Sequence, residues 1–302
     1  MQFRYDEDLV EAAAFVCTSG KRRGIAPLQI RRFHHEREKL YSVLDPEERN
    51  SAFFRLHLEW FREWELEKLL MGVLNSFGLF DEQLEVMAFR KARTKSDEGA
   101  ELYVNDHQQR HGVVALRPER FERDENLVPF LNHELQHLSD MVDPSFGYSR
   151  DIFQPGWTVS QQRLIAERYR LLWDVAIDGR LTANGHETTD EQQRWTEFNR
   201  AFSFLTDEKR ASTFRALWTN PDPTHGGLME LASNPRGLTA SPEQTSGAPC
   251  PLCGFTTFHW GKLQMVSADI LRRIETEFPL WTPDQGACSR CCEVYKSASV
   301  KL

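Results

Sequence analysis

Apolar side chains recur at three- and four-residue spacing between positions 126 and 143, and this period predicts an amphipathic helix. The apolar face consists of Leu127, Leu131, Leu135 and Leu138. Asn126 can cap the first turn, and Pro129 then takes the third helical position, where its missing N–H leaves no donor unpaired. Residues 133–137 are therefore expected well inside the helix.

Short apolar runs upstream of this helix predict a small sheet. The expected strands are Leu84–Phe89, Glu101–Val104 and Gly112–Leu116, separated by polar turns at Lys95–Gly99 and Asn105–His111. A small mixed sheet followed by helices indicates an α+β fold.

Two further helices are predicted from their apolar periodicity. Phe53–Phe77 is expected as one long amphipathic helix, with Trp60 and Trp64 in the core or at a domain contact. Gln161–Ala183 is expected as a helix that ends at the Asn-Gly pair 184–185.

The predicted helix 126–143 carries the motif H-E-x-x-H, with His133, Glu134 and His137. Residues four apart lie on one face of a helix, so the two imidazoles can bind one metal ion while the carboxylate lies beside it. This is the donor set of a catalytic zinc site, in which Glu134 acts as general base. The alternative is a surface helix with two histidines that bind nothing.

A catalytic zinc site needs a third protein ligand, and four carboxylates compete for this position. Asp178 is preferred, because an anion in the C-terminal half of a helix is disfavoured by the helix dipole unless a metal compensates it. Gly179 next to it would let the two helices approach each other. Asp174 and Glu167 share a helix face with Asp178, whereas Asp143 follows His137 by six residues.

At these residues the chain resembles the zincin metallopeptidases, in which an edge strand and the H-E-x-x-H helix line a substrate cleft. The resemblance implies that Gly112–Leu116 is this edge strand and binds an extended peptide. The run Leu172–Asp178 is also similar to the W-N-x-A-x-D segment of predicted metallopeptidases that accompany von Willebrand-type domains. In that family the last aspartate is the presumed third ligand, although the present chain departs from the pattern at Asp174.

Four of the six cysteines form two C-x-x-C pairs, a pattern that predicts a closed structural zinc site. The expected ligands are Cys250, Cys253, Cys288 and Cys291. Cys292 can replace Cys291 or simply pack, and Cys17 is expected to be an ordinary thiol. Phe255–Trp260 is predicted as a strand and Ser267–Phe278 as a helix. The segment resembles zinc-ribbon or treble-clef modules, which bind nucleic acid, bind proteins or only brace a neighbour.

Composition narrows the functional classes. The chain of 302 residues has a formal net charge of −8, which argues against a broad nucleic-acid surface, although Lys21–Arg23 and Arg31–Arg32 are local basic patches. We find no apolar run near twenty residues, and the N-terminus is acidic, so a cytoplasmic protein without membrane contact is expected.

The pattern divides the chain into a helical lead-in (1–50), a zincin-like core (51–219), a linker (220–249) and a zinc module (250–302). The sequence therefore predicts a zinc metallopeptidase with one catalytic and one structural zinc, acting on a peptide or protein substrate. Tyr148, His186 and His225 are candidates to stabilise the oxyanion, with a structural role as the alternative. The alternative function is an inactive metal-stabilised scaffold that recruits a protein or nucleic-acid partner through the C-terminal module.

Overall fold

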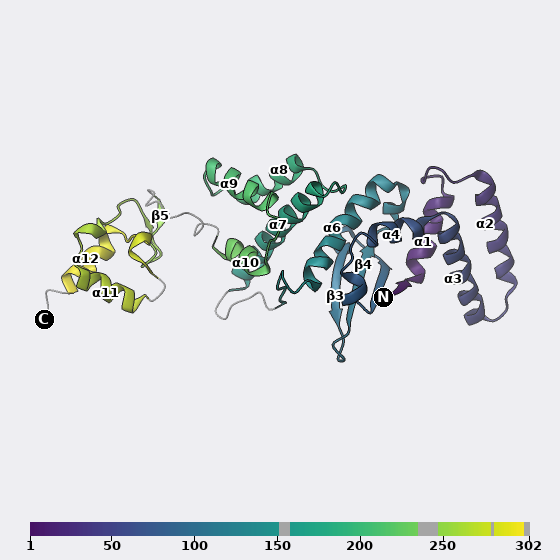
Figure 1. The fold of residues 1–302 in the computed structure, drawn as a ribbon, viewed down its shortest axis with the longest axis horizontal. Helices are drawn as coiled ribbons and strands as arrows, with labels where there is room; N and C mark the ends of the chain where they lie inside the picture. Colours follow the sequence, from purple (N-terminus) through teal and green to yellow (C-terminus); the bar gives the residue numbers. More distant parts are fainter. Residues whose placement is uncertain (151–157, 235–246, 279–280, 299–302) are drawn as a thin grey trace. The chain divides into compact units, whose positions relative to one another are not determined.

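A computed structural model describes residues 1–150, 158–234, 247–278 and 281–298. The chain forms two compact units, Met1–Met229 and Glu230–Leu302 (Figure 1). Helices and a small mixed sheet make up the first unit, so the α+β class is confirmed. The predicted linker 220–249 falls in part on residues 235–246, which lie outside the described residues. Among the described helices, none is long and apolar enough to cross a membrane.

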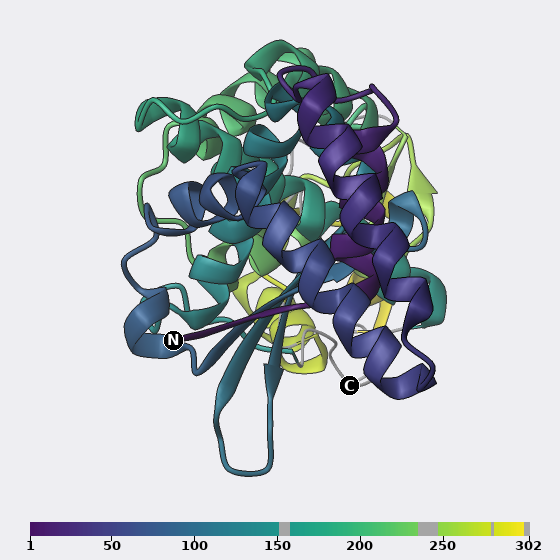
Figure 2. The same ribbon diagram turned by 90° about the vertical axis from the view of Figure 1, so that its right-hand side faces the viewer.

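The sheet of the first unit has four strands in the order β1-β2-β4-β3. They are β1 (Gln2–Tyr5), β2 (Val86–Lys91), β3 (Gly99–Val104) and β4 (Arg110–Leu116). β1 and β4 run parallel to β2, whereas β3 is antiparallel to β4. Figure 2 shows the β3–β4 hairpin extending past the neighbouring helices.

The sheet confirms the three predicted strands and corrects two expectations. The strand containing Gly112–Leu116 lies inside the sheet, paired on both sides, so β3 and not this segment is the edge strand beside the H-E-x-x-H helix. Residues 1–50 were expected as a helical lead-in, but they begin with β1, which pairs with β2. A strand of four residues whose partner residues lie 84 positions away gives little local signal.

Helices before the sheet pack around a shared core. They are α1 (Glu7–Thr18), α2 (Pro27–Lys39), the 3-10 turn η1 (Leu40–Ser42), α3 (Pro46–Glu63), α4 (Leu66–Leu74) and α5 (Phe80–Gln83). The prediction of one helix over Phe53–Phe77 was wrong, because the chain breaks after α3 at Glu65, whose φ of 58° is left-handed. Trp60 and Trp64 are buried core residues, as predicted.

The H-E-x-x-H helix is α6 (Asp124–Val142), which follows the 3-10 turn η3 (Pro118–Glu122). All four leucines of its predicted apolar face are fully buried in the core. The expected cap was wrong: α6 begins two residues before Asn126, behind Arg123, and Pro129 lies inside the helix. One intrahelical hydrogen bond is consequently missing near its start.

The second predicted helix is α7 (Val159–Ala183), which begins with a capping box of Thr158 and Gln161 and ends at Asn184. It is followed by α8 (Glu191–Ala201), α9 (Asp207–Trp218) and α10 (His225–Ser233). Gly179 was expected to let α6 and α7 pack closely, but it contacts α9 instead. A Cβ at this position would lie 2.0 Å from the carbonyl oxygen of Trp218, so only glycine lets the end of α9 pack this closely against α7.

The second unit has its own small core, which includes Ile270, Ile274 and Trp281. Its elements are β5 (Ala248–Pro249), β6 (Thr256–Thr257), the turns η4 (Leu263–Met265) and η5 (Pro283–Gln285), α11 (Ala268–Glu277) and α12 (Ser289–Ala298). The predicted strand is thus a two-residue strand, and the predicted helix is confirmed as α11 with Ser267 at its N-cap.

Candidate metal centre

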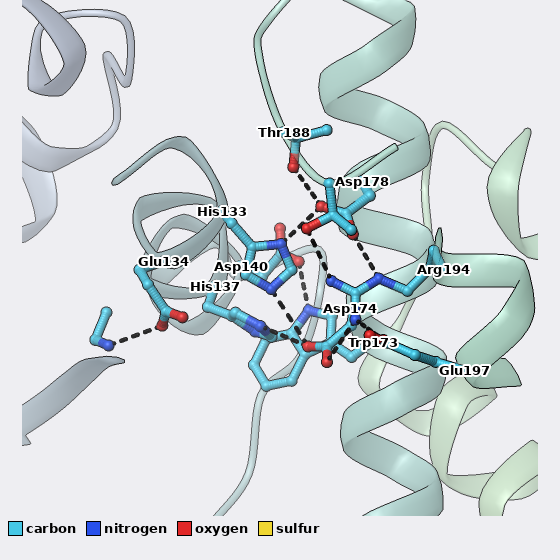
Figure 3. A network of polar contacts seen from close by, with 12 residues as sticks. His133, Glu134, His137, Asp140, Trp173, Asp174, Asp178, Thr188, Arg194 and Glu197 are labelled. Carbon is cyan, nitrogen blue, oxygen red and sulfur yellow. Dashed lines mark hydrogen bonds and ion pairs between the residues drawn. The ribbon is translucent and has the colours of Figure 1, made fainter. Parts of the chain in front are cut away.

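Two helices bring His133, His137 and Asp174 together (Figure 3). The Nε2 atom of His137 lies 3.0 Å from Oδ1 of Asp174, and the Nε2 atom of His133 lies 3.4 Å from the same oxygen. The histidines come from α6 and the aspartate from α7, and the three side chains are buried or partly buried. One carboxylate oxygen therefore faces both imidazoles.

The two N···O distances to Asp174 fit a divalent metal. Ligands bound to zinc at about 2.0–2.1 Å in tetrahedral geometry lie about 3.3 Å from one another, close to both observed N···O distances. The three residues could therefore hold a metal ion and leave its fourth position to a non-protein ligand.

Asp178, the expected third ligand, lies outside this group of ligand atoms. Its Oδ1 atom is 2.7 Å from Nδ1 of His133, and it also accepts a hydrogen bond from the hydroxyl of Thr188. Its Oδ2 atom accepts a hydrogen bond of 2.6 Å from Nε of Arg194. Asp178 is fully buried. Because it contacts Nδ1, the ring nitrogen that does not face Asp174, it orients the imidazole of His133.

The remaining carboxylate candidates are engaged elsewhere. Oδ1 of Asp143 accepts hydrogen bonds of 2.8 Å from the amide and the hydroxyl of Ser145 just after α6. Glu167 is exposed and pairs with Arg163 at 3.1 Å. Neither belongs to the group of three ligands, whereas Asp174, the predicted alternative on the same helix face as Asp178, does.

Glu134 points away from Asp174, toward the edge strand β3 (Figure 3). Its Oε2 atom accepts a hydrogen bond of 3.0 Å from the backbone N–H of Ala100. The approach is close because residue 99 is a glycine: a Cβ there would lie 3.3 Å from the same oxygen. The general-base candidate thus lies between the edge strand and the helix that carries both histidines.

Charge is balanced within this buried cluster. Burial alone would lower the pKa of His133, but hydrogen bonds to Asp174 and Asp178 outweigh it and raise this pKa to about 10. Burial alone would raise the pKa of Asp174, but hydrogen bonds from His133 and His137 hold it well below its usual range. Without a metal, His133 therefore carries a proton, which a metal ion would have to displace.

Arg194 is the member of the cluster that sequence reasoning missed. It lies in α8, is buried, and contacts both Asp178 and Asp174. Burial would lower its pKa, but these two carboxylates raise it. Nothing in its sequence spacing signals this role, because it follows Asp178 by sixteen residues in a different helix.

A second layer of aromatic and charged groups supports His137. The ring of Trp173 packs edge-on against His137, with centroids 4.4 Å apart. Nε1 of Trp173 donates a hydrogen bond of 2.6 Å to Asp140, which also accepts hydrogen bonds from Arg180. Asp140 is therefore a buried carboxylate that links Trp173 to Arg180.

The three oxyanion candidates lie in different surroundings. The hydroxyl of Tyr169 lies 2.7 Å from Nδ1 of His225, so this histidine is tied into the aromatic layer. Tyr148 contacts the rings of Trp173 and His225 at centroid distances of 5.9 and 5.7 Å. The backbone N–H of His186 bonds to Leu181 at the end of α7.

A second candidate metal site lies in the C-terminal unit. Its four ligand atoms are the Sγ atoms of Cys250, Cys253, Cys288 and Cys291. The Cys250–Cys291 and Cys253–Cys288 sulfur pairs are each 3.9 Å apart, close to the roughly 3.8 Å between thiolates bound tetrahedrally to zinc at about 2.3 Å. These four cysteines could hold a metal ion.

Backbone N–H groups also point at these sulfurs. The amide of Cys288 lies 3.3 Å from Sγ of Cys250, and the amide of Cys291 lies 3.4 Å from Sγ of Cys288. Burial would raise the pKa of the Cys250 thiol, but backbone hydrogen bonds lower it to about 7. Cys292 is buried outside the group of four, and burial raises the pKa of the buried Cys17 thiol to about 12.

Comparisons with protein-family models, curated proteins and solved structures gave no match to this chain.

Proposed function

We propose that the first unit is a zinc-dependent hydrolase of peptide bonds, with His133, His137 and Asp174 as ligands and Glu134 as general base. The observation that carries this proposal is the convergence of both Nε2 atoms on one oxygen of Asp174, at distances that suit tetrahedral zinc. When bound, zinc would polarise the scissile carbonyl and activate a water molecule.

Glu134 supports this proposal by its chemistry and its position. Its carboxylate accepts a hydrogen bond from the backbone N–H of Ala100, so it lies beside the edge strand. In the proposed reaction Glu134 removes a proton from the attacking water and returns it to the leaving amine. A scaffold that only bound metal would not need this carboxylate.

The edge strand β3 would orient the substrate. The N–H of Ala100 and the carbonyl of Leu102, both on β3, bond to the side chains of Glu134 and Arg150. An extended peptide that replaced these side chains could pair with the same backbone groups. An extended peptide segment is therefore the proposed substrate class.

We propose that the four-cysteine cluster binds a structural zinc. Its four thiolates form a closed set, with no position left for a substrate. Metal binding there would contribute to the folding of the small C-terminal unit.

The test is cleavage of a proteome-derived peptide library, followed by mass spectrometry. The zinc-loaded protein should cleave a defined set of peptides, and 1,10-phenanthroline should abolish the cleavage. Glu134→Gln should keep the zinc and lose activity by a factor of at least about 100. Glu125→Gln, at an exposed position of the same helix, is the matched control and should keep full activity.

A second candidate function is an inactive metal-stabilised scaffold whose C-terminal unit recruits a partner. The hydrogen bond from Ala100 to Glu134 favours this function, because an oxygen of the proposed base is already bonded to the backbone. This function predicts zinc binding without cleavage of any library peptide. Identical cleavage by the wild type and Glu134→Gln would also exclude the proposed mechanism.

A further inference from the structure

The guanidinium of Arg194 joins the two carboxylates that face opposite nitrogens of His133 (Figure 3). Its Nε atom donates to Oδ2 of Asp178 at 2.6 Å. Its Nη1 atom lies 3.4 Å from Oδ2 of Asp174 and 2.8 Å from Oε2 of Glu197. A single side chain from α8 therefore contacts both aspartates of α7.

The contact with Asp174 affects how this residue can bind a metal. A carboxylate ligand can use one oxygen or both. Here Oδ1 faces the two imidazoles, while Oδ2 faces Arg194. As long as Arg194 keeps Oδ2, Asp174 offers one oxygen, and the metal retains an open position.

The contact with Asp178 has a different consequence. Asp178 is fully buried, and the oxygens of a buried carboxylate need hydrogen-bond partners. Arg194 donates to Oδ2 of Asp178, so Oδ1 is left to accept the hydrogen bond from Nδ1 of His133. The Nε2 atom of His133 is then left for the metal.

We propose that Arg194 is the positioning residue of this centre: it restricts Asp174 to one-oxygen coordination and reserves Asp178 for orienting His133. The inference rests on the metal site of the proposed function and not on peptide cleavage. A lysine would keep the charge but lose the planar fork that contacts both carboxylates.

The test uses Co²⁺ alone as the probe, on the full chain. The dissociation constant and the visible absorption of bound Co²⁺ are measured for each protein. The signal of the His133→Ala/His137→Ala variant is subtracted, because this variant still binds Co²⁺ at the four cysteines. The variants are Arg194→Lys and the double variant Arg194→Met/Asp178→Asn, which leaves no unpaired buried charge. Arg90→Lys is the matched control, because Arg90 contacts both carboxylate oxygens of Asp97 in a similar fork outside this cluster. Circular dichroism verifies each fold.

We expect Arg194→Lys to bind Co²⁺ at least tenfold more weakly. Both Arg194 variants should have weaker visible bands, because the second oxygen of Asp174 raises the coordination number. Arg90→Lys should match the wild type. Wild-type affinity and bands in both folded Arg194 variants would overturn the inference while leaving the proposed function intact. Failure of the wild type to bind Co²⁺ at the histidines would refute both, whereas normal Co²⁺ results without peptide cleavage would refute only the hydrolase.

Discussion

The Nδ1 atom of His133 lies 2.7 Å from Oδ1 of Asp178, on the ring edge opposite the nitrogen that faces Asp174. Two carboxylates one helical turn apart therefore have different relationships to the same imidazole. Asp174 meets the nitrogen available to a metal, and Asp178 meets the nitrogen that fixes the orientation of the ring.

This difference predicts unequal effects of the two aspartates on metal affinity. Asp174→Asn should remove the anionic ligand and abolish stoichiometric zinc binding at the histidines. Asp178→Asn keeps an acceptor for His133 and should weaken zinc by about 10–100-fold. Competition with a chromophoric chelator measures both affinities, with Glu167→Gln as an exposed control. A larger loss in Asp178→Asn than in Asp174→Asn would reverse the two roles.

The four-cysteine cluster predicts a local effect of losing one ligand. Cys250→Ser should release the zinc of the C-terminal unit and unfold that unit, because its small core depends on the metal for stability. Metal analysis should fall from two equivalents to one. Limited proteolysis should degrade residues after about 230 and spare the first unit, with Cys17→Ser as the control. Degradation of the whole chain at one rate would contradict this independence.

We expect the ion pairs of Glu98, just before the edge strand β3, to stabilise the fold in a pH-dependent way. Burial alone would raise its pKa, but hydrogen bonds from Arg120 and Arg117 outweigh this and lower it. The stabilisation is therefore present above the ordinary glutamate pKa, near 4.5, and is lost as the pH falls through the lower folded value. Glu98→Gln should reduce the free energy of unfolding by about 2 kcal/mol at pH 7.

Urea unfolding at several pH values checks this prediction. The difference between the wild type and Glu98→Gln should shrink progressively below pH 4.5. Glu167→Gln, which removes an exposed partner of Arg163, should change stability little at any pH. A deficit in Glu98→Gln that stays constant with pH would rule out the ionic origin.

Gly179 predicts a packing defect on substitution. A Cβ at this position would overlap the backbone of Trp218, so Gly179→Ala should lower the free energy of unfolding by about 1–3 kcal/mol. Gly72→Ala is the matched control, because no atom lies within 4 Å of its Cβ position in α4. It should stabilise by about 0.5–1 kcal/mol through helix propensity. Equal denaturation midpoints for both variants would contradict the close approach of α7 and α9.

Local patterns in the sequence determined several elements of this protein. The leucine spacing of α6 specified both the helix and its buried face, because a period near 3.6 is a property of neighbouring residues. The same spacing placed His133 and His137 on one side of α6. The two C-x-x-C pairs identified the four sulfurs that cluster in the C-terminal unit, although their pairing across the site came only with the fold.

Tertiary structure decided what depends on contacts between distant segments. Asp174 and Asp178 share one face of α7, so periodicity cannot say which of them meets the Nε2 atoms. The answer depends on how α7 is rotated against α6 and on Arg194, which arrives from α8. In the same way, β1 and the edge position of β3 depend on strand pairing and not on the strands' own residues. Sequence spacing fixes which residues share a face, but the packing of helices and strands determines which atoms meet.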